Sequence, residues 1–182
     1  MVVNINRWAP LAMAILFIIM KINKQNSHPI KHIDSTDLPV CLFKNSNSHK
    51  TMQGFAEYGY SAKGTYFGLK MSLISDLKRK ILAVHFTGAG ANDRDIVIPM
   101  AKDIEGIFLA DAGYVSQKLS REFYQEGKRI LLAMPRKNMR KLISGIQNAL
   151  YKTRMIVELN IRNLKLFHGM TTSLPRSANG YF

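Results

Sequence analysis

The sequence predicts an α/β domain built on a mixed sheet that is flanked by helices. Short apolar segments of strand length alternate with longer segments of helical periodicity, and two of the early strands follow one another as a hairpin. Strands and helices in this alternation pack as a sheet with helices on its faces. The chain has 182 residues and is 47% hydrophobic, so it can form one domain with a core.

The first half of the chain predicts the antiparallel part of the sheet. Residues 33–41 have the pattern of a strand that Pro39 ends or confines to an edge. The polar stretch from residue 44 to 63 predicts a long loop. Residues 65–74 and 81–87 are apolar and are separated by a charged turn, which predicts a β-hairpin.

The second half predicts alternating helices and strands. A helix is expected near residues 94–102, followed by a buried strand at 106–113. The next helix is expected at 116–125, with Gly127 just beyond its end. An apolar strand at 129–135 then precedes a basic segment and a long helix.

The long helix carries a polar stripe. Residues 151–167 contain neither Pro nor Gly, and their apolar residues recur with a period close to that of a helix. At about 100° per residue, four polar residues would fall within an arc of roughly 60°. They are Tyr151, Arg154, Glu158 and Lys165. Taken alone, such a stripe is more often a solvated face with ion pairs than a site.

Charge and cysteine content narrow the class of protein. The net charge of +14, from 26 basic and 12 acidic residues, favours an anionic polymer or a membrane surface as partner. A basic, ribosome-like protein would have the same balance. The single cysteine, Cys41, excludes an internal disulfide and a cysteine-based zinc site, and it fits a reducing cytoplasm.

The N-terminal region contains an uninterrupted apolar run at residues 11–20, between Arg7 and Lys21. The run is short for a membrane span, which needs about 20 apolar residues. No small-residue cleavage site follows it, as a secretion signal would require. We therefore expect a buried helix here, in preference to a signal or an anchor.

The tyrosines near Lys63, together with Phe55, have two interpretations. They could form a platform on which single-stranded nucleic acid stacks. Core aromatics are the favoured interpretation.

Three acidic residues are candidates for a shared site. Asp34 stands within a predicted strand, Asp111 ends another, and Glu158 lies on the long helix. Each alone is explained as a turn or cap carboxylate, but carboxylates that converge are stable together chiefly around a hard cation. Oxygen ligands without cysteine point to Mg²⁺ or Mn²⁺. Two such ions can hold both oxygens of a phosphoryl transfer, and the basic excess would bind a nucleic acid backbone.

Three local signatures occur in order along the chain. Residues 33–41 surround the first aspartate, and residues 108–116 are similar to a Gly-Asp-x-Gly-Tyr motif around the second. The polar stripe reproduces a Tyr-x2-Arg-x3-Glu-x6-Lys pattern without a gap. With these signatures, residues 31–167 resemble the catalytic domain of DDE-type transposases from bacterial insertion sequences. The resemblance implies an RNase H-like mixed sheet flanked by helices.

The resemblance also implies the roles of six residues. The catalytic, metal-binding triad would be Asp34, Asp111 and Glu158, with two Mg²⁺ or Mn²⁺ ions as cofactors. The DNA-binding residues would be Tyr151, which positions the strand, and Arg154 and Lys165, which face phosphates. The implied reaction is cleavage of a phosphodiester at a transposon end, followed by attack of the freed 3′-hydroxyl on target DNA.

Partners and domain limits follow from the same resemblance. Double-stranded DNA, as transposon ends and as target, would be the partner, with a possible homodimer, no membrane, and a cytoplasmic, nucleoid-associated location. Residues 1–30 would be the remnant of an N-terminal helical region, residues 31–168 the catalytic domain, and residues 169–182 a tail. Asp37 and Ala112 depart from the family pattern.

The family has a larger region before its first aspartate and a further helix after its glutamate, so we expect a truncated copy. Two alternatives to an active transposase stay open. One is an inactive remnant that only binds DNA, and the other is a hydrolytic nuclease of the same fold.

Overall fold

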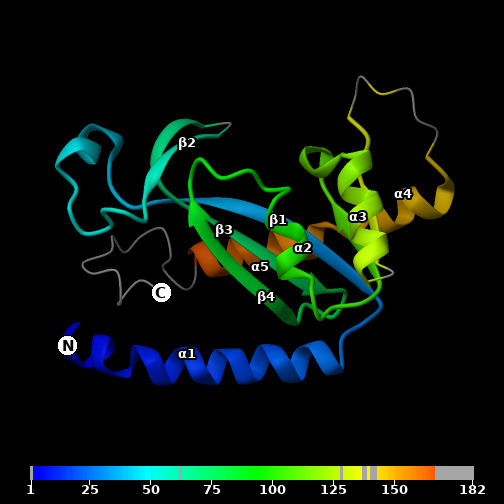
Figure 1. Cartoon of the computed structure of the whole chain (residues 1–182), viewed down its shortest axis with the longest axis horizontal. Helices are drawn as coiled ribbons and strands as arrows, with labels where there is room; N and C mark the ends of the chain where they lie inside the picture. The colour runs from blue at the N-terminus through cyan, green and yellow to red at the C-terminus, as the bar shows by residue number, and fades with distance from the viewer. Residues whose placement is uncertain (1, 62, 128, 137–138, 140–142, 167–182) are drawn as a thin grey trace.

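The sheet forms the centre of the molecule, as Figure 1 shows for the computed structural model. The structure describes residues 2–61, 63–127, 129–136, 139 and 143–166. Within them, a mixed sheet of six strands is flanked by helices, so the predicted fold class is confirmed. The strands are β1 (Ile30–Pro39), β2 (Glu57–Ser61), β3 (Gly64–Asp76), β4 (Ile81–Gly88), β5 (Ile107–Ala110) and β6 (Ile130–Ala133).

The strand order is β2-β3-β1-β5-β6, and β4 also pairs with β3. The long strand β3 is antiparallel to β1, β2 and β4, and its two ends pair with different partners: residues 64–68 with β2 and residues 69–75 with β4. The strands β5 and β6 run parallel to β1. The predicted hairpin and the later strands are therefore confirmed.

Helices cover both faces of the sheet, and within the described residues two short 3₁₀ segments lie in the connections. The helices are α1 (Val2–Gln25), α2 (Val97–Met100), α3 (Gln117–Gly127), α4 (Gly145–Lys152) and α5 (Met155–Leu166). The 3₁₀ segments are η1 (Phe43–Ser48) and η2 (Ala112–Tyr114).

One face of the sheet packs on α2 and α3. Its core joins Ile33 and Phe108 of the strands to Val97 of α2 and Phe123 of α3, all fully buried. The rings of Phe108 and Phe123 meet edge to face at 5.0 Å between centroids. This apolar face fixes β1 next to β5, where two of the predicted site residues lie.

The other face packs on α5. Val157 and Ile161 of this helix pack against Leu73 of β3. Leu73 stands directly opposite Asp34 in the β1–β3 ladder, so both side chains project from the same face. The helix that carries Glu158 is therefore docked on the face that carries Asp34.

Four predicted elements differ from the structure. Part of the expected loop at residues 44–63 forms β2, because a polar segment can pair as an edge strand on β3. The helix expected at 94–102 is shorter, and Gly127 is the last residue of α3 rather than the residue after it. The expected long helix is broken into α4 and α5 at Thr153 and Arg154.

The predicted N-terminal helix is present, but the prediction that it is buried is wrong. Residues 2–25 are helical, but Trp8, Phe17 and Ile18 are more than half exposed. The helix lies along β4, as Figure 1 shows, and the side-chain amide of Asn23 donates to the carbonyl of Ile81. An apolar run that continues around a helix cannot bury every side of it against one strand.

Among the helices that the structure describes, none combines the length and apolar character that a membrane crossing needs. The predicted tail at 169–182, and most of the basic segment after Arg136, lie outside the described residues.

The docking of α5 can be tested by a matched pair of substitutions on that helix. Ile161→Ala should lower the free energy of unfolding by about 2–4 kcal/mol, because it removes a buried side chain from the contact with Leu73. Leu159→Ala, on the exposed side of the same helix, should cost less than about 1 kcal/mol. Urea unfolding measures both values, and equal losses would contradict this packing.

Candidate functional site

The site is built on β1, whose residues alternate between the two faces of the sheet. His32 and Asp34 stand two residues apart and project from the face that packs on α5. His32 is fully buried, and the side chain of Asp34 is 19% exposed. The strand thus presents an imidazole and a carboxylate side by side at the edge of the core.

These two side chains hold the break between α4 and α5. His32 Nε2 lies 2.8 Å from the hydroxyl of Thr153, which itself lies 2.6 Å from the carbonyl of Leu150. The single hydroxyl proton goes to that carbonyl, so His32 Nε2 donates to Thr153. Asp34 Oδ2 lies 3.5 Å from the guanidinium of Arg154, and the two form an ion pair.

Asp111 follows directly after β5, next to β1. The parallel register pairs His32 with Leu109. The ladder ends at this pair; if it continued by two residues, it would set Asp34 opposite Asp111, and the charge of Asp111 does act on Asp34. Asp111 is also the N-cap of η2: its Oδ1 accepts from the main-chain N–H of Gly113 at 2.7 Å. This bond fixes the carboxylate at the end of the strand.

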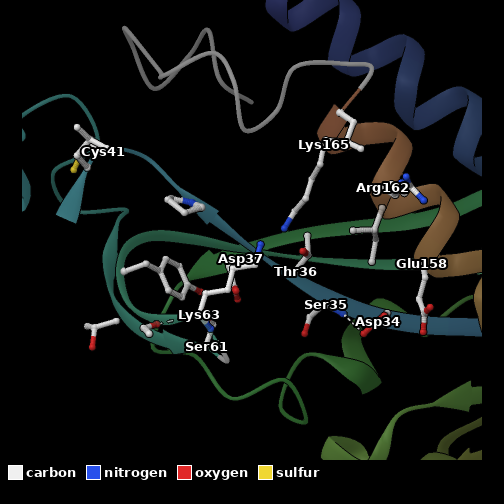
Figure 2. A pocket seen from close by; sticks show the side chains of 17 residues that line it. Asp34, Ser35, Thr36, Asp37, Cys41, Ser61, Lys63, Glu158, Arg162 and Lys165 are labelled. Carbon is white, nitrogen blue, oxygen red and sulfur yellow. Dashed lines mark hydrogen bonds between the residues drawn. The ribbon is translucent and has the colours of Figure 1, made fainter.

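Glu158 reaches the same region from α5. It adjoins Val157, which anchors the helix on Leu73. With Asp34 it lines an open cleft of about 660 Å³ between α5 and the hairpin of β2 and β3. Figure 2 shows the side chains of Asp34 and Glu158 at one end of this cleft.

The electrostatics couple the three carboxylates. Burial raises the pKa of Asp34 to about 6, the Arg154 guanidinium and the N–H of Ser35 act in the opposite direction, and the charges of Asp111 and Glu158 raise it further. The chain therefore holds a desolvated carboxylate next to two others. Such a perturbed group in a cleft is typical of a functional site.

Burial also lowers the pKa of His32 to about 4, and the charge of Arg154 acts in the same direction. The imidazole is therefore neutral at neutral pH and can keep its donor role at the junction. The Nδ1 atom of His32 and the Nε atom of Arg154 are buried without a hydrogen-bond partner among the described residues. Unsatisfied polar atoms at this junction are a further mark of a site under functional constraint.

Three of the described basic residues also line the cleft. Lys165 and Arg162 come from α5, and Lys63 comes from the β2–β3 hairpin. Figure 2 shows the Lys165 side chain extending from α5 toward Asp37 and Thr36 on β1. Burial lowers the pKa of Lys165, whereas Asp37 raises it. The cleft therefore contains three carboxylates, of Asp34, Asp37 and Glu158, and three cations, of Lys63, Arg162 and Lys165.

The transposase DDE domain family matches residues 24–177, which is most of the chain and includes all three carboxylates. This chain belongs to the DDE transposase family. Among solved structures, a piggyBac transposase in a synaptic complex with hairpin DNA is similar, with a TM-score of 0.43 and 16% identity. The similarity covers 64% of this chain and 25% of that one, so this chain spans only a quarter of that transposase. No curated protein sequence matches it.

DDE transposase domains use divalent metal ions. In this member, among the described residues, no three Asp, Glu, His or Cys side chains are grouped closely enough to hold one ion together. The donor set nevertheless fits a hard cation, because it consists of carboxylate oxygens, and Asp34 is destabilised by its two acidic neighbours.

Of the three predicted DNA-binding residues, Tyr151 and Arg154 contact other parts of the protein, whereas Lys165 lines the cleft. The break between α4 and α5 separates Tyr151 from the rest of the predicted stripe. Tyr151 is buried, and its hydroxyl donates to the carbonyl of Ala133 at 3.1 Å. Arg154 faces Asp34 and is 13% exposed. Only Lys165 lines the cleft directly.

The structure adds residues that the sequence analysis missed. His32 and Thr153 fix the helical junction, and the buried ring of Tyr114 lies near the carboxylates. Burial raises the pKa of the Tyr114 hydroxyl, and the charges of Asp93, Asp34 and Asp111 raise it further. The position of His32 two residues before Asp34 along one strand, and therefore on the same face, was the sequence signal that could have identified His32.

The buried charge of Asp34 predicts an unusual effect on stability. Because the folded-state pKa is raised from its ordinary value of 3.8 to about 6, the native chain loses stability as the pH rises through this range. Asp34→Asn has no such titration and keeps an acceptor for Ser35. The stability difference in favour of Asp34→Asn should grow by about 3 kcal/mol between about pH 4 and pH 8.

Urea unfolding at several pH values measures this difference. The control is Asp95→Asn, which changes an exposed carboxylate. A difference that does not vary with pH, or that falls as the pH rises, would show that Asp34 is not desolvated in this way.

Proposed function

We propose that this chain catalyses cleavage of a DNA phosphodiester and transfer of the freed 3′-hydroxyl to target DNA, in the transposition of an insertion sequence. One observation carries the proposal: Asp34 and Glu158, which are far apart in the sequence, line one cleft together with Lys63, Arg162 and Lys165, and the charge of Asp111 acts on Asp34. The cations of this cleft suit a phosphodiester whose flanking phosphates need binding, and its carboxylates Asp34 and Glu158 suit metal ions at the reacting phosphate.

Asp34, Asp111 and Glu158 would hold the divalent ions, Mg²⁺ or Mn²⁺, and a pair of them suits this reaction. When bound, such ions stabilise the charge that develops on the attacking and leaving oxygens. The chain's own contribution is to fix the three carboxylates: Asp34 by the Ser35 N–H, Asp111 by the Gly113 N–H, and Glu158 by the docking of α5.

The basic residues have separate roles in this proposal. Lys165, from within the cleft, binds a phosphate of the DNA strand. Arg154 orients Asp34 and offsets its charge. Tyr151 anchors α4 to β6 through the Ala133 carbonyl, so its role is to position the junction.

The Tyr-Arg-Glu-Lys pattern supports an origin in a bacterial insertion sequence, and the domain division at residues 30 and 168 stays part of the proposal. Double-stranded DNA is the proposed partner, because the chain carries a net charge of +14. A homodimer and an association with the nucleoid belong to the same proposal.

The carboxylates can be tested with the purified full chain, a duplex carrying transposon-end sequence, and Mg²⁺ or Mn²⁺. Asp34→Asn, Asp111→Asn and Glu158→Gln should each reduce strand cleavage by at least about 100-fold, because each removes a ligand that stabilises the transition state. Glu122→Gln, on α3, is the matched control and should keep full activity. Gel analysis of cleaved and joined strands measures the result.

The products of this assay separate the alternatives. Joined strands would identify a transposase, whereas free 3′-hydroxyl ends without joining would identify a hydrolytic nuclease. Salt-sensitive DNA binding by the native chain without any cleavage would identify a protein that only binds DNA.

The phosphate contact of Lys165 predicts a change in the salt dependence of binding. Lys165→Gln should weaken DNA binding and reduce the slope of log affinity against log salt by about 1, since one phosphate contact is lost. The matched control is Lys152→Gln, which removes an exposed lysine from α4. Fluorescence anisotropy over a range of salt concentrations measures both slopes, and equal changes would assign no specific contact to Lys165.

A further inference from the structure

The segment between β1 and β3 exposes aromatic side chains next to the cleft. Phe43, Phe55 and Tyr58 are each about half exposed, and Tyr60 is 84% exposed. The interpretation as core aromatics is therefore wrong for Phe55, Tyr58 and Tyr60, whereas Tyr66, which also lies near Lys63, is buried. A ring as exposed as that of Tyr60 gains little from the core and is available to a partner.

Tyr60 stands at the rim of the cleft that holds Asp34 and Glu158. It pairs with Thr65 across the β2–β3 ladder, and Thr65 itself lines the cleft. Ser61 and Lys63, at the tip of the same hairpin, also line it. Figure 2 shows Ser61 and Lys63 on one side of the cleft and Lys165 on the other.

The direction of the Tyr60 side chain follows from the ladder. Tyr58 stands opposite Phe67, and paired residues project from the same face. Phe67 packs on a cluster that includes Leu38 and Leu164 of α5, so this face of the hairpin is the one next to α5. Tyr60, two residues beyond Tyr58 on the same strand, projects from that face as well.

Tyr58 and Tyr60 differ in how they are held. The Tyr58 hydroxyl donates to Asn47 Oδ1 at 2.9 Å, and its ring lies 5.0 Å from that of Phe67. Among the described residues, none forms a hydrogen bond or a ring contact with Tyr60. The fixed ring of Tyr58 thus supports the strand, while the ring of Tyr60 is free to receive a ligand.

The charge around Tyr60 indicates the chemistry of that ligand. Lys44, Lys50 and Lys63 are exposed on this segment, against the single acid Glu57. A protein partner would favour an interface core depleted in charge. Aromatic rings that alternate with lysines suit single-stranded nucleic acid, whose bases stack while its phosphates pair with cations.

We propose that Tyr60 stacks on an unpaired base of the DNA strand that lies in the cleft, and that Lys63 binds an adjacent phosphate. This inference rests on the proposed function, because it takes the cleft as the site of DNA. It adds a binding residue from outside the three family signatures.

The test compares two DNA probes with the full chain, in the absence of divalent metal. One probe is a blunt duplex, and the other is the same duplex with a short single-stranded 3′ extension that contains 2-aminopurine. Stacking on Tyr60 should quench the 2-aminopurine fluorescence. Tyr60→Ala should abolish the quenching and weaken binding of the extended probe about tenfold, with unchanged binding of the blunt duplex.

Two further variants serve as controls. Tyr60→Phe keeps the ring and should keep the quenching. Tyr124→Ala removes another exposed tyrosine, on α3, and should change neither probe. Circular dichroism establishes that each variant is folded.

Three outcomes would overturn the inference. If the native chain binds the blunt duplex but shows neither quenching nor a preference for the extension, the stacking site is absent while the proposed function survives. If Tyr60→Ala weakens both probes equally, Tyr60 does not recognise an unpaired base. If the native chain binds neither probe, the proposed function fails together with the inference.

Discussion

The contact on which the candidate site depends joins β1 to the break between α4 and α5. His32 and Asp34, two residues apart on one strand, hold Thr153 and Arg154, which lie more than a hundred residues later. Because these residues end one helix and begin the next, their contacts fix where α5 starts. The rotation of α5 then sets Glu158 toward Asp34, while Val157 and Ile161 bury its apolar side against Leu73.

This arrangement is electrostatically unfavourable on its own. Burial raises the pKa of Asp34, and two acidic neighbours raise it further, so the charged form costs free energy at neutral pH. The partial compensation by Arg154 and by the Ser35 N–H does not remove that cost. The apolar packing of α2 and α3 on the opposite face of the sheet holds β1 and β5 side by side despite it. A fold that maintains such a cost at one cleft is typical of a functional site.

Much of the fold was predictable from the sequence because its strands are apolar runs of the right length, bounded by turns. The break at Thr153 and Arg154 was not, since no Pro or Gly marks it and the contact with His32 that accompanies it is distant in sequence. The family signatures predicted that Asp34 and Asp111 share a site, and the charge of Asp111 acting on Asp34 supports this prediction. The prediction that Tyr151 shares one helix face with Glu158 and Lys165 assumed an unbroken helix, and it is wrong because the helix is interrupted between them. The prediction that residues 11–20 are buried was wrong, because an apolar sequence does not show whether the rest of the fold has enough surface to cover it.

Exposed apolar side chains occur on the helix α1 and on the segment that includes the β2–β3 hairpin. The position of each relative to the cleft indicates whether it could take part in DNA binding. The helix α1 borders β4, and the pocket between them includes Lys21, Lys24 and Asp103, with none of the proposed catalytic carboxylates among its lining residues. The β2–β3 hairpin instead adjoins the cleft of Asp34 and Glu158, and it carries lysines among its aromatics. Every base has an aromatic face on which a side chain can stack. Tyr60, at this rim, would therefore add affinity for DNA without a sequence preference. That property suits a transposase, because the strand next to its reacting phosphodiester can then have many sequences.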